Sequence, residues 1–202
     1  KGLDNLKDAE LFTRKAIELK PDFSNAHCNL GNILKDLGNL KEAEASTRKA
    51  IELKPDFSMA HSNLGSILSD LGILKDAEAS TRKAIELKPD FADAHYNLGN
   101  ILKDLGNLKE AEASTRKAIE LKPDFADAHY NLGNILKDLG NIDEALLCYE
   151  AAINIDQTIE YALEGIGQML LAKGNHSEGL IKLREAIGSI GFNPNNSSIT
   201  IN

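Results

Sequence analysis

Residues Ala92–Phe125 read ADAHYNLGNILKDLGNLKEAEASTRKAIELKPDF, a stretch of 34 residues that returns along the chain with few changes. Ala126–Asn141 repeats Ala92–Asn107 letter for letter, and Ser24–Phe57 and Ser58–Phe91 are further copies. A fixed period of this size is typical of stacked supersecondary units, in which each copy buries its apolar face against its neighbours. We therefore expect a repeat array rather than one central core.

Each copy contains two helical patterns separated by a glycine. In the first half, apolar residues such as Leu98 and Ile101 recur at offsets of three and four, which indicates one buried helix face. Gly106 is suited to the left-handed conformation that ends this helix. Asn107 is the expected N-cap of a second helix, which Pro123 ends. Each copy is therefore expected to be a helical hairpin, with small residues such as Gly99 letting the two helices approach closely.

The repeated unit resembles the tetratricopeptide repeat. Five residues match the family signature, namely Leu98, Gly99, Ala111, Ala118 and Pro123. Three stand where bulky residues are usual, namely His95, Leu102 and Thr115. The pattern is also similar to the repeats of O-linked N-acetylglucosamine transferase, which favour His-x-Asn-Leu at the start of the first helix. The resemblance covers nearly the whole chain and implies an all-α, right-handed α-solenoid (superhelix) of stacked antiparallel helix pairs.

The period also divides the chain. We expect a half copy at 1–23, full copies at 24–57, 58–91, 92–125 and 126–159, a degenerate copy at 160–193 and a tail at 194–202. The half copy supplies only the second helix, at Asn5–Lys20, so the face with Leu6, Phe12 and Ile17 is left uncovered. Either the chain was cut there, as its start without Met indicates, or another chain covers this face. Gly165 and Gly179 are expected to weaken the two helices of the degenerate copy. The tail is expected to be a frayed end or the opening strand of a further domain.

Composition argues against several partner classes. The net charge is −8 and no basic stripe is present, so nucleic acid is not an expected partner. No run approaches the roughly 18 apolar residues of a membrane helix. Cys28 and Cys148 lie three to four copies apart, too far to pair within one solenoid at roughly 10 Å per helix layer. A reducing, cytoplasmic compartment is therefore expected.

The sequence contains no pattern of catalytic residues. The four recurring histidines fall in successive layers and cannot share a metal ion, so each is expected to pack in the slot where the family usually has tryptophan. They are His27, His61, His95 and His129. No nucleophile elbow, glycine-rich phosphate loop or carboxylate pair is apparent. We therefore expect neither an enzyme, nor a metal site, nor a cofactor.

The polar stripe of each first helix is the candidate binding surface, because first helices line the concave side in tetratricopeptide arrays. Its most regular feature is a row of asparagines at Asn29, Asn63, Asn97 and Asn131. The glycosyltransferase repeats that this chain resembles use an asparagine ladder at the same position to hold an extended peptide. An asparagine amide both donates and accepts, so it can pair with a peptide group of any sequence.

Further candidates lie on the same stripe. They are Asn32, Asn100 and Asn134, Tyr96 and Tyr130, and Lys103 and Lys137. The carboxylate clamp of chaperone-binding relatives needs a basic residue where this chain has Cys28, Ser62, Tyr96, Tyr130 and Glu164, so an acidic C-terminal peptide is not the expected ligand. Duplication alone would also copy surface residues, so repetition does not by itself establish their use.

The sequence therefore predicts a non-catalytic protein–protein interaction module that binds an extended peptide or partner segment through the asparagine ladder. Two alternatives belong to other classes. In the first alternative, the chain is a recognition arm of a larger enzyme, such as a glycosyltransferase. In the second, it is a self-associating scaffold whose uncapped ends stack on each other.

Overall fold

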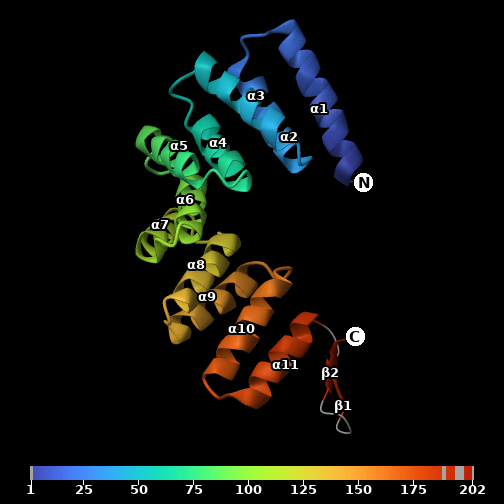
Figure 1. Cartoon of the computed structure of the whole chain (residues 1–202), viewed down its shortest axis with the longest axis vertical. Helices are drawn as coiled ribbons and strands as arrows, with labels where there is room; N and C mark the ends of the chain where they lie inside the picture. The colour runs from blue at the N-terminus through green and yellow to red at the C-terminus, as the bar shows by residue number, and fades with distance from the viewer. Residues whose placement is uncertain (1, 188–189, 194–197, 202) are drawn as a thin grey trace. The chain divides into compact units, whose positions relative to one another are not determined.

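A computed structural model describes residues 2–187, 190–193 and 198–201 (Figure 1). The chain divides into two compact units, called here unit 1 (Lys1–Asn107) and unit 2 (Leu108–Asn202). Unit 1 contains α1 (Gly2–Leu19), α2 (Ser24–Asp36), α3 (Leu40–Leu53), α4 (Ser58–Asp70), α5 (Leu74–Leu87) and α6 (Ala92–Asp104). Unit 2 contains α7 (Leu108–Leu121), α8 (Ala126–Asp138), α9 (Ile142–Ile155), α10 (Glu160–Ala172), α11 (His176–Ile187), β1 (Ile190–Asn193) and β2 (Ser198–Ile201).

The helices recur with the period of the sequence. First helices begin at Ser24, Ser58, Ala92, Ala126 and Glu160. Each is followed by a glycine whose φ lies between 74° and 85°, a backbone conformation that favours glycine. The next residue then donates its amide back into the helix, as Asn39 N does to Leu34 O at 2.8 Å. The predicted recurrence of helix pairs is confirmed, and no strand lies between residues 24 and 159.

A glycine–threonine contact brings the two helices of a pair together in unit 1. A β-carbon on Gly31 of α2 would collide with Thr47 of α3, and one on Gly65 of α4 would collide with Thr81 of α5. Both threonines are fully buried. Thr47 donates its hydroxyl to the carbonyl of Ala43, one turn back, at 2.8 Å. The predicted close approach at these glycines is therefore made against threonine side chains whose hydroxyls are satisfied.

The Lys-Pro-Asp-Phe loops are fastened to the helices that follow them. His61 Nε2 lies 2.9 Å from the carbonyl oxygen of Pro55, and His27, His95 and His129 make the same contact at 2.9–3.0 Å. The ammonium of Lys54 lies 5.1 Å from the centre of the Phe57 ring, a cation–π contact that recurs in the other loops. The histidines, expected as packing residues, therefore also anchor the preceding loop.

The first helix departs from its predicted bounds. α1 begins at Gly2, ahead of the expected Asn5. Asp4 stands where the other copies have a glycine with positive φ, so the helix is not interrupted there. Ile17, expected on the uncovered face, packs instead against the buried leucines of α2. Phe12 does lie on an uncovered face and is 67% exposed.

Two of the asparagines before second helices do not cap as predicted. Asn39 and Asn141 occupy the N-cap positions of α3 and α9, but neither side chain makes a capping hydrogen bond. Their ψ angles of 58° and 67° depart from the extended backbone that aims a side-chain oxygen at the helix amides. Their carbonyls instead accept the first helical bonds, from Ala43 N and Ala145 N, each at 3.0 Å.

In unit 2 a tyrosine replaces the buried threonine. Tyr149 of α9 is fully buried, and its ring lies against Gly133 of α8 and Gly165 of α10, where added β-carbons would collide with it. Its hydroxyl donates to Asn134 Oδ1 at 2.9 Å, and burial raises the pKa of the phenol. Gly165, expected only to weaken its helix, therefore provides the space for this ring.

A second glycine of unit 2 was also misread from the sequence. Gly179 of α11 faces Gly167 of α10, so a β-carbon on either one would meet the carbonyl oxygen of the other. Gly179 was expected to weaken α11. Its absent side chain instead lets the two helices approach closely.

Two short strands follow α11. β1 and β2 pair antiparallel, with Ile190 opposite Ile201. β2 falls within the predicted tail, for which a frayed end and the opening strand of a further domain both stay predictions. Residues 194–197 and 202 of the predicted tail lie outside the described residues. None of the helices within the described residues combines the length and apolarity needed to cross a membrane.

Candidate peptide-binding face

The predicted asparagine row lies along the first helices but is not uniformly exposed. Asn29 is exposed, Asn63 and Asn97 are half-buried, and Asn131 is only 4% exposed. The row follows the edge where successive first helices meet, so its exposure depends on the neighbouring side chains. The expected open position of Asn131 is therefore wrong. Its amide nitrogen is buried without a hydrogen-bond partner among the described residues.

In unit 1 the asparagine row ties successive first helices together. Asn63 Nδ2 of α4 donates to Cys28 Sγ of α2 at 3.2 Å, and Asn97 Nδ2 of α6 donates to Ser62 Oγ of α4 at 3.1 Å. Burial raises the pKa of the Cys28 thiol, and the bond from Asn63 partly offsets this shift. Within the described residues, the Oδ1 atoms of Asn63 and Asn97 accept no hydrogen bond.

A polar pocket of about 260 Å³ lies between α4 and α6, and is called here the α4–α6 pocket. It is lined by Ser66, Ser69 and Asp70 of α4 and by Asn97, Asn100, Ile101, Lys103 and Asp104 of α6. Ser66 and Ser69 stand where the other regular copies have asparagine and lysine. Because these serines are shorter, space opens beside Asn97 and Asn100.

The charges of the α4–α6 pocket follow from the same replacement. Lys35 Nζ of α2 lies 3.8 Å from Asp70 Oδ2 of α4. At the equivalent place in α4, Ser69 replaces the lysine, so Asp104 of α6 receives no such cation from α4. Lys103 is half-buried in the lining, as Lys137 is at the equivalent place on α8. The pocket therefore offers both hydrogen-bond donors and acceptors.

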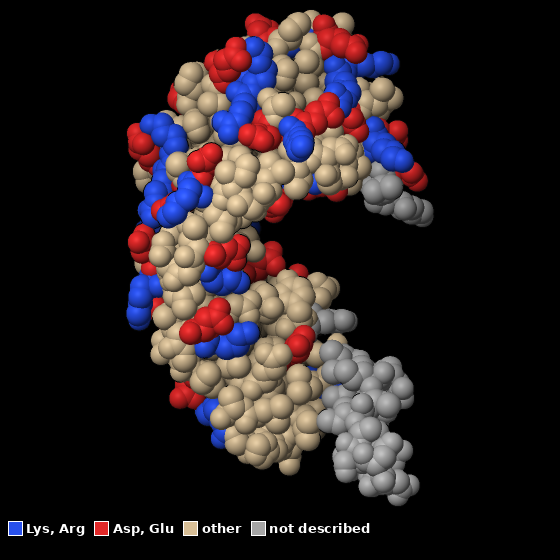
Figure 2. Space-filling model, viewed as in Figure 1, with Lys and Arg blue, Asp and Glu red and all other residues tan. Residues whose placement is uncertain are grey.

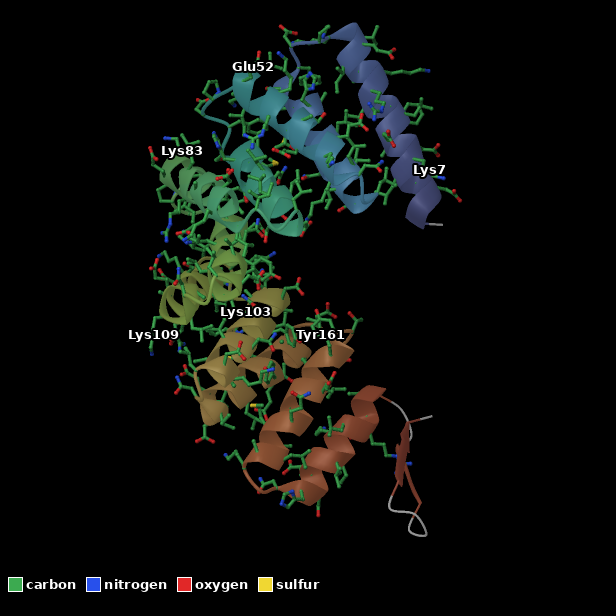
Figure 3. The ribbon with its side chains drawn as sticks, in the orientation of Figure 1. Lys7, Glu52, Lys83, Lys103, Lys109 and Tyr161 are labelled. Atoms are coloured by element: carbon green, nitrogen blue, oxygen red, sulfur yellow. The ribbon has the colours of Figure 1, made fainter. Side chains whose placement is uncertain are left out.

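In unit 2 several of the predicted contact residues serve packing instead. The Tyr130 ring lies 5.6 Å from the Tyr149 ring and 4.5 Å from the Tyr161 ring, which is edge-on to it. Tyr161 projects from α10 (Figure 3), and its hydroxyl donates to Asp127 Oδ1 at 3.2 Å. Asn134 is occupied by the Tyr149 hydroxyl. In unit 1, the counterpart of Tyr130 is Tyr96, which is half-buried.

No metal site is visible in the part of the chain that the structure describes, where no group of three or more His, Cys, Asp or Glu side chains converges. The two cysteines are buried free thiols. Burial, with a smaller contribution from Glu144, raises the pKa of Cys148 to about 11. At neutral pH this thiol is protonated and therefore a poor nucleophile.

The sequence prediction missed the face formed by the second helices. The α1–α3 groove of unit 1 has a volume of about 410 Å³, and the α9–α11 groove of unit 2 about 290 Å³. Seven lining positions of the first correspond to positions of the second four periods later. The pairs are Arg14 and Glu150, Ile17 and Ile153, Glu18 and Asn154, His27 and Leu163, Leu30 and Ile166, Glu42 and Glu178, and Ser46 and Lys182.

A signal for this difference was present in the sequence. Residues 142–151 read IDEALLCYEA, whereas the regular copies read LKEAEASTRK over the same positions, as at 108–117. Leu146 and Glu150 thus replace a glutamate and an arginine that form ion pairs in the other second helices. The replacement marks a surface with different contacts, but only the packed helices show what it faces.

Glycine turns, paired helices and glycine contacts together define a helical repeat protein. Family models described as tetratricopeptide repeat match residues 24–57, 60–91 and 126–159. A further model described as TPR repeat matches residues 77–106 and 99–140. The chain belongs to the tetratricopeptide-repeat family.

Solved structures agree with this assignment. The chain is similar to YrrB, described as a TPR protein with an unusual peptide-binding site, with 28% identity over 87% of this chain and 90% of that chain and a TM-score of 0.66. It is similar to MamA, with 27% identity over 78% and 92% of the two chains and a TM-score of 0.69. The APC/C hetero-tetramer Cut9–Hcn1 shares the fold, with 18% identity over 91% and 37% of the two chains and a TM-score of 0.84. No curated protein matches the chain.

Proposed function

We propose that this protein is a non-catalytic interaction module that binds an extended protein segment on the first helices of unit 1. The observation that carries the proposal is the α4–α6 pocket, because asparagine amides line it beside hydroxyl and carboxylate oxygens. Membership of the tetratricopeptide-repeat family supports a protein or peptide partner. The similarity to YrrB, described as having a peptide-binding site, points to the same ligand class.

The contacts would be directed at the peptide backbone. Asn97 uses one N–H for Ser62 and keeps a second N–H and its Oδ1 for a ligand. Asn100 has no hydrogen-bond partner among the described residues, so its whole amide is available. Each such bond contributes about 0.5–1.5 kcal/mol net. Asn29, Asn32 and Asn63 extend the same edge along α2 and α4.

The test uses a peptide selected from a phage-displayed random library on the wild-type protein. Asn100→Ala removes a groove amide with no internal bond, and Asn97→Ala removes one that also holds Ser62. Ser62→Ala is the matched control, because it breaks the same internal bond and leaves Asn97 in place. We expect the two asparagine variants to lose affinity by roughly two- to tenfold each, and the serine variant to retain it.

Two outcomes contradict the proposal. If both asparagine variants bind the selected peptide as the wild type does, these side chains are duplicated surface and not a binding site. If Ser62→Ala loses as much affinity as Asn97→Ala, the effect comes from the contact between α4 and α6 rather than from the ligand.

A second candidate is that the chain is the recognition arm of a larger multidomain enzyme, such as a glycosyltransferase. The supporting observation is the His-x-Asn-Leu start of its first helices, similar to the repeats of O-linked N-acetylglucosamine transferase. The full reading frame decides this candidate. A cytoplasmic location also belongs to the proposal, since Cys28 and Cys148 are free thiols.

The third candidate is a self-associating scaffold. Among the side chains of α1 that the structure describes, the large apolar ones that are exposed are Leu11 at 54%, Phe12 at 67% and Leu19 at 88%. Exposed large apolar side chains favour association. Sedimentation velocity at several concentrations tests it, because Phe12→Glu should abolish any concentration-dependent association. An unchanged association would place the contact elsewhere.

A further inference from the structure

The α1–α3 and α9–α11 grooves lie at the same place in the repeat but differ in how they are closed. In unit 1, Arg14 Nη2 reaches from α1 to Glu42 Oε1 of α3 at 2.6 Å, and also pairs with Glu10 at 2.8 Å. The guanidinium therefore bridges the groove. The bond to Glu42, followed by that to Glu10, raises the pKa of Arg14. The groove of unit 1 thus supplies its own cation.

The same bridge occurs elsewhere in the array. Arg116 of α7 pairs with Glu144 of α9 at 2.6 Å, at positions equivalent to Arg14 and Glu42. In both copies, an arginine of one second helix therefore forms an ion pair with a glutamate of the next second helix.

In the α9–α11 groove the arginine is missing. Glu150 stands at the position of Arg14, and Glu178 at the position of Glu42, so carboxylates occupy both ends of the bridge. Both side chains are exposed, and neither has a hydrogen bond or ion pair within the described residues. Lys182 also lines the groove, but its Nζ is bound to Glu185 Oε2 at 2.8 Å. The groove of unit 2 therefore has the acceptors of the bridge without the donor.

The lining of the α9–α11 groove contains five leucines and isoleucines, whereas that of its counterpart contains two. Leu163 replaces His27, and Leu146 replaces a glutamate. Beside the groove, Ile181 is 56% exposed where unit 1 has an alanine. On the face shown in Figure 2, the surface over α10 and α11 is mostly uncharged, whereas charged side chains cover much of the surface over α1 to α5.

We propose that the α9–α11 groove is a second docking site, which binds a partner protein segment through an arginine that bridges Glu150 and Glu178 and an aliphatic neighbour that rests on the apolar floor. Arginine fits because its planar guanidinium donates to two carboxylates at once, and its hydrocarbon stem lies against Ile153 and Ile166. An exposed ion pair alone contributes little, so the aliphatic contact supplies the rest of the affinity.

The test replaces the missing donor within the chain. Glu150→Arg introduces an arginine that should pair with Glu178, as Arg14 pairs with Glu42 in unit 1. The arginine of the chain itself then occupies the place proposed for the partner's arginine. Asp90→Arg, in an exposed loop of unit 1, makes the same change in net charge away from the groove. The double variant Glu150→Gln/Glu178→Gln removes the carboxylates while keeping the shape of the groove. All three are compared with wild type in selections from a phage-displayed random peptide library.

We expect the wild-type selection to contain peptides in which arginine adjoins Leu, Ile, Val or Met. Their affinity should fall by about tenfold or more on Glu150→Arg, which places a cation in the site, and by about two- to tenfold on Glu150→Gln/Glu178→Gln, which removes only the carboxylates. It should stay unchanged on Asp90→Arg and on Asn100→Ala. The last comparison separates this site from the α4–α6 pocket.

Other outcomes overturn the proposal. If no selected peptide loses affinity specifically for Glu150→Arg and Glu150→Gln/Glu178→Gln, the groove is not a docking site for such a segment. Selective loss of peptides that lack arginine would disprove the bridging contact. If Glu150→Arg changes only the sedimentation of the protein itself, a second copy of the chain occupies the groove.

Discussion

Units 1 and 2 use the same repeat position to hold a helix pair together, but with side chains of very different size. In unit 1, Thr47 and Thr81 each fill a gap above one glycine of the paired helix. In unit 2, Tyr149 fills the equivalent gap above Gly133 and also extends to Gly165 of α10. One enlarged side chain therefore links three helices where a threonine links two. The register of a repeat fixes where contacts form, and the departures from it decide how many helices they join.

Tyr149→Thr should have the largest effect, because it replaces the linking side chain of unit 2 with the one used in unit 1. Removing a buried aromatic ring leaves a cavity and costs about 3–5 kcal/mol. Urea unfolding followed by circular dichroism measures the loss. Tyr149→Phe is the matched control, since it keeps the ring and removes only the bond to Asn134, at a cost of about 0.5–1.5 kcal/mol. Equal losses for both variants would contradict a packing role for the ring.

Gly165→Ala comes next. Alanine normally stabilises a helix relative to glycine by about 1 kcal/mol, but here its β-carbon would collide with the Tyr149 ring. We expect a net destabilisation of about 1–3 kcal/mol. In a Tyr149→Thr background the collision is gone, so the same substitution should then stabilise. A stabilising effect in the wild-type background would show that the ring does not depend on this glycine.

These two variants also mark the limit of the sequence prediction. The glycine turns at Gly38 and Gly106 were predictable because each follows an apolar helical pattern and needs only local backbone geometry. Gly165 was misread because its role depends on Tyr149, which lies on another helix. Asn131 was misread for a similar reason, since burial depends on neighbours that the period does not reveal. The position of Glu150 and Glu178 in one groove could not be predicted, because it depends on how α9 and α11 pack side by side.

The thiol of Cys148 should make the stability of unit 2 depend on pH at high pH. The equivalent residue of unit 1 is Ser46, which does not ionise in this range. Its folded-state pKa is raised from 9.0 to about 11, mainly by burial. The stabilisation that this shift gives is present below pH 9 and is lost as the pH rises from 9 to about 11, because the unfolded thiol ionises first. Urea midpoints across this range, compared between wild type and Cys148→Ser, measure it. A wild-type decline no steeper than that of the variant would contradict the assignment.

The smallest expected effect concerns the bridges between second helices. Arg14 reaches Glu42 and Arg116 reaches Glu144, whereas Arg48, within the described residues, pairs with Glu44 of its own helix alone. At the bridging position α5 carries Asp76, one methylene shorter. Asp76→Glu should complete the bridge and stabilise unit 1 by about 0.2–1 kcal/mol, with a dependence on salt. Glu42→Asp is the reverse test and should destabilise by a similar amount. No change in either variant would show that these bridges contribute nothing measurable.

A nuclear magnetic resonance titration with a library-selected peptide tests directly whether the first helices of unit 1 bind an extended protein segment. The side-chain amides of Asn97 and Asn100 give their own ¹H–¹⁵N signals. We predict that both signals shift and saturate with the same dissociation constant as the peptide. If the peptide binds while both signals stay unchanged, the α4–α6 pocket is not the binding site, and the proposed function of unit 1 is contradicted.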